Sequence, residues 1–358
     1  MRARAVAAAV GPAGLAPGLP GTRRGLPTGR RPHPGRPLFL YLCVVETLTA
    51  AADPRRGYAL AVLNMLISGV AIYVNSLGVR MFSDAVLYTA LKNAVVGIAF
   101  LLPLVVSPSR RAGFRRLGTR QWWLLLVVAL IGGSISYALY FRGLQVTSPV
   151  SASLVDHTQF LLVALMAAVF LRERPGPAVW AALAVLSAGL TLGIALHTVR
   201  ADAGLLFVGA ATILFAADFV LMKYLLRAVA ALTVMTFKMS VGSALLLAIV
   251  AARGHLSGIA SLSPVQWGFV AVTGLILLAF TVTSVLGLRH ASATAVTAIP
   301  AGAPIVTTGL VVLTQRVAVP AARWLGLALV LLAVLTIFIV GRRREAQGRR
   351  RPTGGEAT

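Results

Sequence analysis

The sequence predicts an all-α membrane protein whose ten transmembrane helices form two inverted five-helix repeats. Three observations lead to this prediction. The chain is strongly apolar, long segments of it carry no charge, and motifs in its first half recur about 145 residues later in its second half.

Composition separates this chain from soluble proteins. Of its 358 residues, 58% are hydrophobic and 12% are charged, and the mean hydropathy is +0.87. Soluble domains contain about 25% charged residues. Roughly 17–25 apolar residues suffice to cross the hydrocarbon core as a helix. Six segments long enough for this contain no Asp, Glu, Lys or Arg: 57–79, 121–141, 175–199, 254–288, 290–315 and 324–341.

These apolar segments are continuous, so they favour helices over the alternating strands of a β-barrel. Proline and glycine within them are compatible with helices because neighbouring helices satisfy the freed backbone groups. Ten helices are expected, at 58–79, 84–106, 121–141, 149–171, 177–197, 204–223, 230–251, 265–287, 293–314 and 324–341.

The internal repeat is visible in three pairs of short motifs. They are Leu91-Lys92-Asn93 with Phe237-Lys238-Met239, Gln121-Trp122 with Gln266-Trp267, and Gly143-Leu144 with Gly287-Leu288. The spacings of 146, 145 and 144 residues hold register over three consecutive helices. The chain therefore divides into repeats at 57–199 and 200–341, between a disordered basic tail at 1–56 and a basic cytoplasmic tail at 342–358.

Each repeat has an odd number of helices, so the second begins on the opposite side of the membrane from the first. Lys92 and Lys238 each lie about nine residues from a helix end, roughly 12 Å deep at 1.5 Å per residue. The inversion places Lys92 in the outer half of the membrane and Lys238 in the inner half. Inverted repeats of this kind are typical of secondary transporters with a binding site near the midplane.

The net charge of +24 is distributed by side of the membrane rather than along a nucleic-acid-binding face. With the amino terminus inside, 25 of the 33 basic residues lie on the cytoplasmic side, six lie outside, and two are within helices. This asymmetry predicts cytoplasmic termini in the plasma membrane. The expected partners of the basic tails are anionic lipid headgroups, and no nucleic acid is expected.

The segment 38–52 is a short apolar run after a basic stretch, and Glu46 interrupts it. A signal peptide, a membrane-inserted segment and a translation start further downstream all stay open for it.

Ten helices in two halves, each with a basic residue inside its second helix, resemble the EamA family of the drug/metabolite transporter superfamily. The similarity extends to the fourth helix of each half. Residues 143–175 combine a start rich in small residues, an apolar body and the turn Glu173-Arg174, and the second copy carries Pro300 and Pro304. Two departures from the family are Gln315, in place of an acidic residue, and lysine where the family more often has arginine. The resemblance implies a carrier and favours export.

Charged side chains in the bilayer usually face the bundle interior or a transport pathway. Lys92 and Lys238 are therefore the leading candidates for binding a carboxylate or phosphate group of a solute. The alternative is that they pair with buried carboxylates and hold helices in register. Asp156 and His157 are candidates for carrying a coupling proton, or Asp156 neutralises a lysine while His157 bonds to a carbonyl.

Other residues have weaker assignments. Asp218 either lines the pathway or pairs with Lys223 or a cytoplasmic arginine, and Glu173 and Arg174 either end a helix or restrain an inner gate. Polar residues such as Asn64 and Tyr140 are pathway candidates, although hydroxyls in membrane helices often bond to the backbone or a neighbouring helix. Pro300 and Pro304 free backbone carbonyls and permit bending of the ninth helix.

Motifs of enzymes do not appear in this chain: there is no metal-ligand spacing, phosphate-binding loop or nucleophile elbow. No catalytic residue, cofactor or metal is expected. The predicted function is a secondary transporter of a small metabolite or drug-like solute, with a homodimer as a candidate assembly. The alternatives are a membrane-embedded enzyme acting on lipid-linked substrates and a sensor or scaffold that does not transport.

Overall fold

The computed structural model describes residues 53–78, 81–106, 114–115, 117–147, 155–156, 158–192, 202–316 and 319–350. All of them belong to one compact unit, Val44–Thr358. Within the described residues every regular element is a helix, as the sequence predicts. The segment 38–52, nearly all of the predicted amino-terminal tail and the last eight residues lie outside the described residues.

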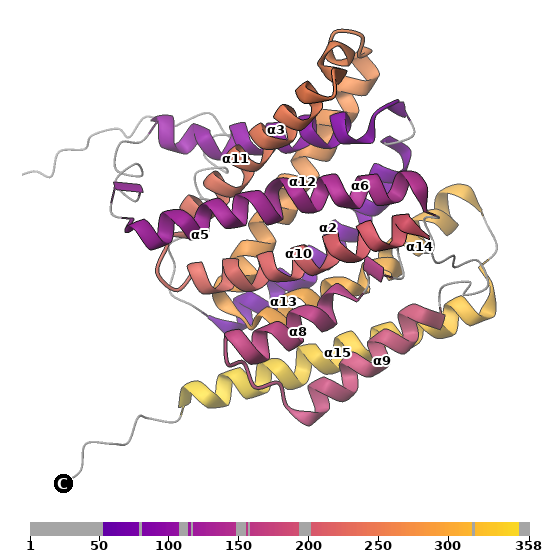
Figure 1. The fold of residues 1–358 in the computed structure, drawn as a ribbon. Helices are drawn as coiled ribbons and strands as arrows, with labels where there is room; N and C mark the ends of the chain where they lie inside the picture. The colour runs from indigo at the N-terminus through magenta and orange to yellow at the C-terminus, as the bar shows by residue number, and fades with distance from the viewer. Residues whose placement is uncertain are drawn as a thin grey trace, which may run out of the picture. The chain divides into compact units, whose positions relative to one another are not determined.

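In the part of the chain that the structure describes, eight helices are long and apolar enough to cross a membrane. They are α2 (Pro54–Gly78), α3 (Ala85–Val106), the run of α5 (Thr119–Leu130), η2 (Ile131–Ile135) and α6 (Ser136–Val146), α10 (Ala203–Leu225), α11 (Ala231–Ala252), α12 (Pro264–His290), the run of α13 (Ala293–Ala298), η5 (Pro300–Gly302) and α14 (Ala303–Gln315), and α15 (Ala321–Arg350). Two shorter apolar helices, α8 (Gln159–Phe170) and α9 (Pro177–Leu192), complete the set (Figure 1).

The two shorter helices occupy the positions predicted for the fourth and fifth spans. The predicted fourth helix, 149–171, begins among residues outside the described part, and α8 covers its second half. The predicted fifth helix, 177–197, also extends past the last described residue of α9. Ten spans therefore stay a prediction, and the structure establishes eight helices of membrane-spanning length.

Local sequence sets where several helices begin. The Ser263 hydroxyl accepts a hydrogen bond from the Gln266 amide and the Gln266 side chain accepts one from the Ser263 amide, with Pro264 at the first helical position of α12. This reciprocal arrangement satisfies amides that the helix leaves without partners. Asp202 caps α10 and Ser292 caps α13 in the same sense.

Three elements differ from the predicted helices. The third predicted helix, 121–141, contains the π-helical turn η2 and continues to Val146. The ninth, 293–314, is interrupted by the 3-10 turn η5 at Pro300, where the ring removes a backbone donor. The predicted tail after 341 begins as helix, because α15 continues to Arg350 through residues that are mostly good helix formers.

Packing between the halves follows a two-fold pattern. Three helices pack on their own counterparts: α3 on α11, α9 on α15, and α8 on α13. Other contacts occur in exchanged pairs, so α2 on α12 corresponds to α10 on α6, and α2 on α14 corresponds to α10 on α8. Figure 1 shows α9 beside α15 and α10 beside α6. The internal repeat in the sequence is therefore also a repeat in helix packing.

Contacts between turns fall at two separate ends of the helices. The first group joins the segment before α3 to the segment between α11 and α12, through Asp84 with His255 and Met81 with Gln266. The second joins the start of α2 and the turn after α8 to the turn between α12 and α13. The helices thus run between two groups of turns, as spans between two membrane faces would.

Candidate functional site

The two buried lysines occupy the same position on related helices. Lys92 is seven residues after the first residue of α3, and Lys238 is seven residues after the first residue of α11. Neither side chain points outward into the surroundings of the bundle, since Lys92 is 9% exposed and the Lys238 side chain is 12% exposed. Their surroundings nevertheless differ in charge.

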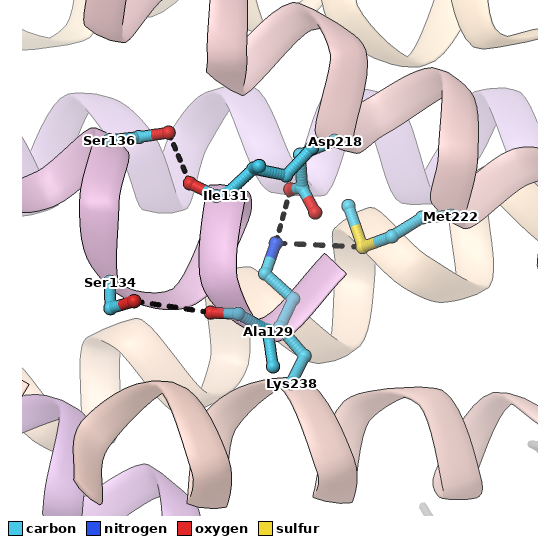
Figure 2. A network of polar contacts seen from close by, with 7 residues as sticks. All are labelled: Ala129, Ile131, Ser134, Ser136, Asp218, Met222 and Lys238. Atoms are coloured by element: carbon cyan, nitrogen blue, oxygen red, sulfur yellow. Dashed lines mark hydrogen bonds and ion pairs between the residues drawn. The ribbon is translucent and has the colours of Figure 1, made fainter. Parts of the chain in front are cut away.

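Lys238 forms an ion pair with Asp218 of α10, a residue that is 1% exposed (Figure 2). The Lys238 ammonium donates to Asp218 Oδ2 and also contacts Met222 Sδ at 3.6 Å. The predicted partners of Asp218, Lys223 and a cytoplasmic arginine, are therefore wrong. The Lys223 ammonium is turned to the carbonyl oxygens of Leu288 and Ala291 at the end of α12 instead.

The π-helical turn η2 makes the space for Asp218. A Cβ at Gly132 would overlap the carboxylate carbon of Asp218. At the next residue, a Cβ at Gly133 would lie 2.8 Å from the carbonyl oxygen of Lys238 and 2.9 Å from Gly242 Cα. The two glycines let η2 approach both α10 and α11 closely, and π-helical turns are frequent at functional sites.

The hydroxyl groups around this turn donate hydrogen bonds to backbone carbonyls and not to the ion pair. Ser134 Oγ donates to the Leu130 carbonyl at 2.9 Å. Figure 2 shows its longer contact of 3.5 Å with the Ala129 carbonyl and the hydrogen bond that Ser136 Oγ donates to the Ile131 carbonyl. A π-helical turn displaces backbone carbonyls from their regular partners, so these hydroxyls supply replacement donors. The sequence Gly132-Gly133-Ser134 was the one available signal for this turn.

One oxygen of the Asp218 carboxylate, Oδ1, is buried and has no hydrogen-bond partner among the described residues. Tyr137 of α6 interacts electrostatically with Asp218, and its ring packs edge-on against Phe215 at 5.1 Å between centroids. The carboxylate is therefore held by a single cation in an otherwise apolar and aromatic setting.

Lys92 has neutral partners. Its ammonium donates to Asn75 Oδ1 at 3.0 Å and lies 5.2 Å from the centre of the Tyr88 ring. The Tyr88 hydroxyl donates to the same Asn75 oxygen at 2.9 Å. No carboxylate forms an ion pair with Lys92 within the described residues, and α2 and α3 contain no acidic residue. The sequence repeat could not predict this difference in charge. It aligns Lys92 with Lys238, but it does not align Asn75 with Asp218.

Asn64 joins two helices. Its amide nitrogen contacts the carbonyl oxygen of Phe280 and the hydroxyls of Thr283 and Ser284 on α12, at 2.8–3.0 Å, and the residue is 1% exposed. Asn64 thus forms a polar contact between α2 and α12, and its place in the pathway stays a prediction.

The predicted proton-carrying pair is only partly described. Asp156 is half-buried and forms no ion pair within the described residues, and His157 lies outside them. Tyr140 of α6 interacts electrostatically with Asp156 and packs near Phe215, with 6.4 Å between ring centroids. Tyr140 and Asp156 are therefore near each other.

Glu173 caps the broken helix of the second half. Its carboxylate accepts from the Ala293 amide at 2.7 Å and from the Thr294 amide and hydroxyl at 3.3 and 3.1 Å. Arg174 is exposed. Both residues line a pocket of about 240 Å³ whose wall includes Arg344, and the Arg344 guanidinium lies against Gly176. This geometry matches the helix-end role of Glu173 more closely than an ion pair with Arg174.

At the opposite end, Asp84 and His255 form a pair that no sequence motif indicated. Asp84 Oδ2 lies 2.6 Å from His255 Nδ1, and Asp84 Oδ1 accepts from the Val86 amide at 2.8 Å. Burial alone raises the pKa of Asp84, but the hydrogen bonds from His255, Val86 and Leu87 and the charge of Arg253 outweigh it. The pKa therefore lies below its ordinary value of 3.8.

The described residues contain no group of three or more His, Cys, Asp or Glu side chains that could hold a metal ion. What the arrangement offers is electrostatic: a buried cation with neutral partners, and a buried cation neutralised by one carboxylate. Such groups can recognise and release a charged solute without covalent chemistry.

Comparison with known proteins agrees with the geometry. Residues 55–194 and 202–339 each match the sequence profile of the EamA-like transporter family. None of the curated proteins matches the chain. Among solved structures, one described only as the crystal structure of a protein is 21% identical to this chain, with a TM-score of 0.62. The alignment covers 80% of this chain and 98% of that one, and it supports the fold alone. The family match confirms the resemblance predicted from the sequence.

Proposed function

The chain belongs to the EamA-like transporter family, and from this premise we propose that it is a secondary transporter of a small metabolite or drug-like solute. It is a multi-pass membrane protein with two EamA repeats. Transport proceeds by alternating access between the two repeats, and export is the direction that the family resemblance favours. Membership of a transporter family also agrees with the prediction that the chain is not an enzyme.

The proposed topology has ten spans in two inverted repeats. The protein lies in the plasma membrane, with both termini in the cytoplasm. The two separate groups of turn contacts support it, because each group contains only turns that the topology assigns to one face. Packing of α8 and α9 on the long helices α10 and α15 supports counting both as spans. Anionic lipids at the basic ends and a homodimer stay predictions.

The observation that carries the functional proposal is the buried Lys92 ammonium with neutral partners. Placing a charge in the hydrocarbon region costs about 2.5–3.5 kcal/mol on insertion scales. Asn75 and Tyr88 stabilise the ammonium by a hydrogen bond and by the face of the ring, but neither neutralises it. A cation kept in this state is suited to binding a carboxylate or phosphate group of the solute.

Purified protein in proteoliposomes tests this proposal with a panel of labelled carboxylates and phosphate esters. Replacing Lys92 by Gln removes a charge-assisted contact worth about 1.5–3 kcal/mol, so flux at low solute concentration should fall roughly tenfold or more. Lys92→Arg keeps the charge and serves as the matched control. Monodispersity in detergent checks that each variant folds. Unchanged flux in both Lys92→Gln and Lys238→Gln would remove the lysines from the pathway.

A further inference from the structure

We propose that Asp218 is a proton-binding site, and that a proton there releases Lys238 to bind the anionic group of the solute. Solute and proton then move together. This inference rests on the proposed function and deepens it, because it names the coupling ion and the residue that binds it. The sequence analysis places proton coupling at Asp156 and His157, in the first repeat, whereas Asp218 lies in the second.

The first support is the unequal use of the Asp218 carboxylate. Oδ2 accepts from the Lys238 ammonium, whereas Oδ1 is buried without a partner among the described residues. A buried carboxylate is normally stabilised by several donors, and burial of an ion pair is favourable only when the remaining lone pairs are also satisfied. Here one cation alone keeps the carboxylate ionised, so the charge state of Asp218 depends on the position of Lys238.

The second support is that the elements packed on Asp218 supply few other charges. Lys238 of α11 and Tyr137 of α6 face it, while the described side chains of η2, α8 and α13 are all uncharged. α5 has Arg120 near its start, over the ring of Tyr224. α12 has Arg289 and His290 at its last turn, and Lys223 on α10 itself contacts backbone carbonyls there. None of these forms an ion pair with Asp218.

The third support is that the Lys238 side chain can move away from Asp218. The Lys238 side chain is 12% exposed and that of Asp218 is 1% exposed, so the lysine side chain borders accessible space while the aspartate does not. The Lys238 ammonium is carried on a flexible hydrocarbon stem, whereas the Asp218 carboxylate is packed against Gly132. Breaking the pair therefore moves the cation and leaves the carboxyl group in place.

The exchange balances in atoms and charge. A proton binds to the carboxylate of Asp218 and gives the neutral acid, the ion pair breaks, and Lys238 keeps its positive charge. A monoanionic solute then binds to Lys238, so the loaded site has the same net charge as the empty one. When the solute leaves, Lys238 returns to Asp218 and the proton is released. Efflux of an accumulated anion by this route takes protons out with it.

The two lysines acquire different roles under this scheme. Within the described residues no carboxylate pairs with Lys92, so its charge is available in every protonation state of Asp218. Lys238 is neutralised by its ion pair with Asp218 until Asp218 is protonated. Because the repeat places these lysines at opposite depths, one face of the carrier binds the anion directly and the other binds it only with a proton.

Infrared difference spectroscopy of the full-length protein in liposomes tests the proton site without a solute. On acidification from mildly alkaline to mildly acidic conditions, the wild type should gain the carbonyl band of a buried carboxylic acid. Asp218→Asn should lose this band, and Asp202→Asn, which changes the capping residue of the same helix, should keep it. If the band persists in Asp218→Asn, or the wild type gains none, the proposal is overturned.

The double variant Asp218→Asn/Lys238→Gln covers the case in which the single variant fails to fold, since it leaves no unpaired charge. Proton movement is then followed with a pH-sensitive dye inside vesicles, using benzenesulfonate as the probe anion, because a sulfonate stays ionised and does not carry protons across the bilayer by itself. Any panel member that the wild type moves is added as a second probe. In Asp218→Asn, the number of protons moved per solute should fall to near zero, whatever the rate of solute flux. A pH change that persists in this variant contradicts the coupling. If the wild type moves no solute, the proposed function fails, while the infrared band still decides the proton site.

Discussion

Lys92 and Lys238 occupy matching positions on related helices, yet their partners differ in charge. The ion pair of Lys238 neutralises a buried charge locally, whereas the contacts of Lys92 with Asn75 and Tyr88 only stabilise it. Removing one member of a buried ion pair costs about 3–5 kcal/mol because it leaves the other charge uncompensated. Asp218 and Lys238 should therefore be sensitive to single substitutions for a structural reason as well as a functional one, which is why a charge-free double variant is needed.

Asp84 offers a pH-dependent prediction at the level of one residue. Its lowered pKa means that its contribution to stability is present above the ordinary value of 3.8 and is lost as the pH falls through the folded-state pKa. Asp84→Ala removes both the cap of α3 and the contact with His255, and should lower the unfolding free energy by about 1 kcal/mol or more at neutral pH.

Thermal unfolding in detergent measures this effect at neutral pH and in acid. The wild type and Asp84→Ala should differ at neutral pH and converge in acid, because protonation removes the same interactions as the substitution. His255→Gln, which removes the imidazole partner of Asp84 but keeps the capping oxygen, should have a smaller effect than Asp84→Ala. A difference between wild type and Asp84→Ala that is equally large in acid would contradict this assignment.

At the scale of elements, η2 is the segment on which the Asp218 site depends. Its glycines allow α10 and α11 to approach a helix that would otherwise hold them apart. Gly132→Ala should displace Asp218 from Lys238 and destabilise the protein by about 1–3 kcal/mol, the usual cost of adding a methyl group to a packed core. Thermal unfolding in detergent measures the loss, and the infrared band of Asp218 should shift with it.

Gly268→Ala in α12 is the matched control for this substitution. A Cβ at Gly268 meets no atom within 4 Å, so the change should be neutral or stabilise the helix by up to about 1 kcal/mol. If the two variants unfold alike, the close contact between Gly132 and Asp218 does not constrain the site.

At the scale of the whole molecule, the sequence predicted the features that arise from apolar length and repetition. Eight long helices, the position of both lysines in equivalent helices and the family all follow from segment composition and register. Contacts across the bundle could not be predicted, because hydropathy does not encode which helices meet. Asp218 was therefore assigned the wrong partner, and the contacts of Asn64 with α12 were not predicted. The π-helical turn was missed because two glycines within an apolar helix are compatible with regular α-helix as well.

The proposed inverted topology makes a prediction about the two ends of the molecule. The contact between Asp84 and His255 places the segments around Ser83 and Ser257 at the same end of the helices. Topology assigns this end to the outside, and it assigns the turn containing Ala228 and the end of α15 to the cytoplasm. The four positions tested below are exposed in the structure, so labelling there reports membrane side rather than burial.

Single cysteines in a Cys43→Ser background test this assignment with a maleimide that does not cross membranes. In intact cells, Ser83→Cys and Ser257→Cys should react, whereas Ala228→Cys and Arg343→Cys should react only after lysis. Reaction of all four in intact cells would indicate leaky cells and is checked with a cytoplasmic marker protein. If Ser83→Cys and Ser257→Cys report opposite sides, an odd number of spans does not separate the halves. The inverted relation between Lys92 and Lys238 would then be lost, because both ammonium groups would approach the same face of the membrane.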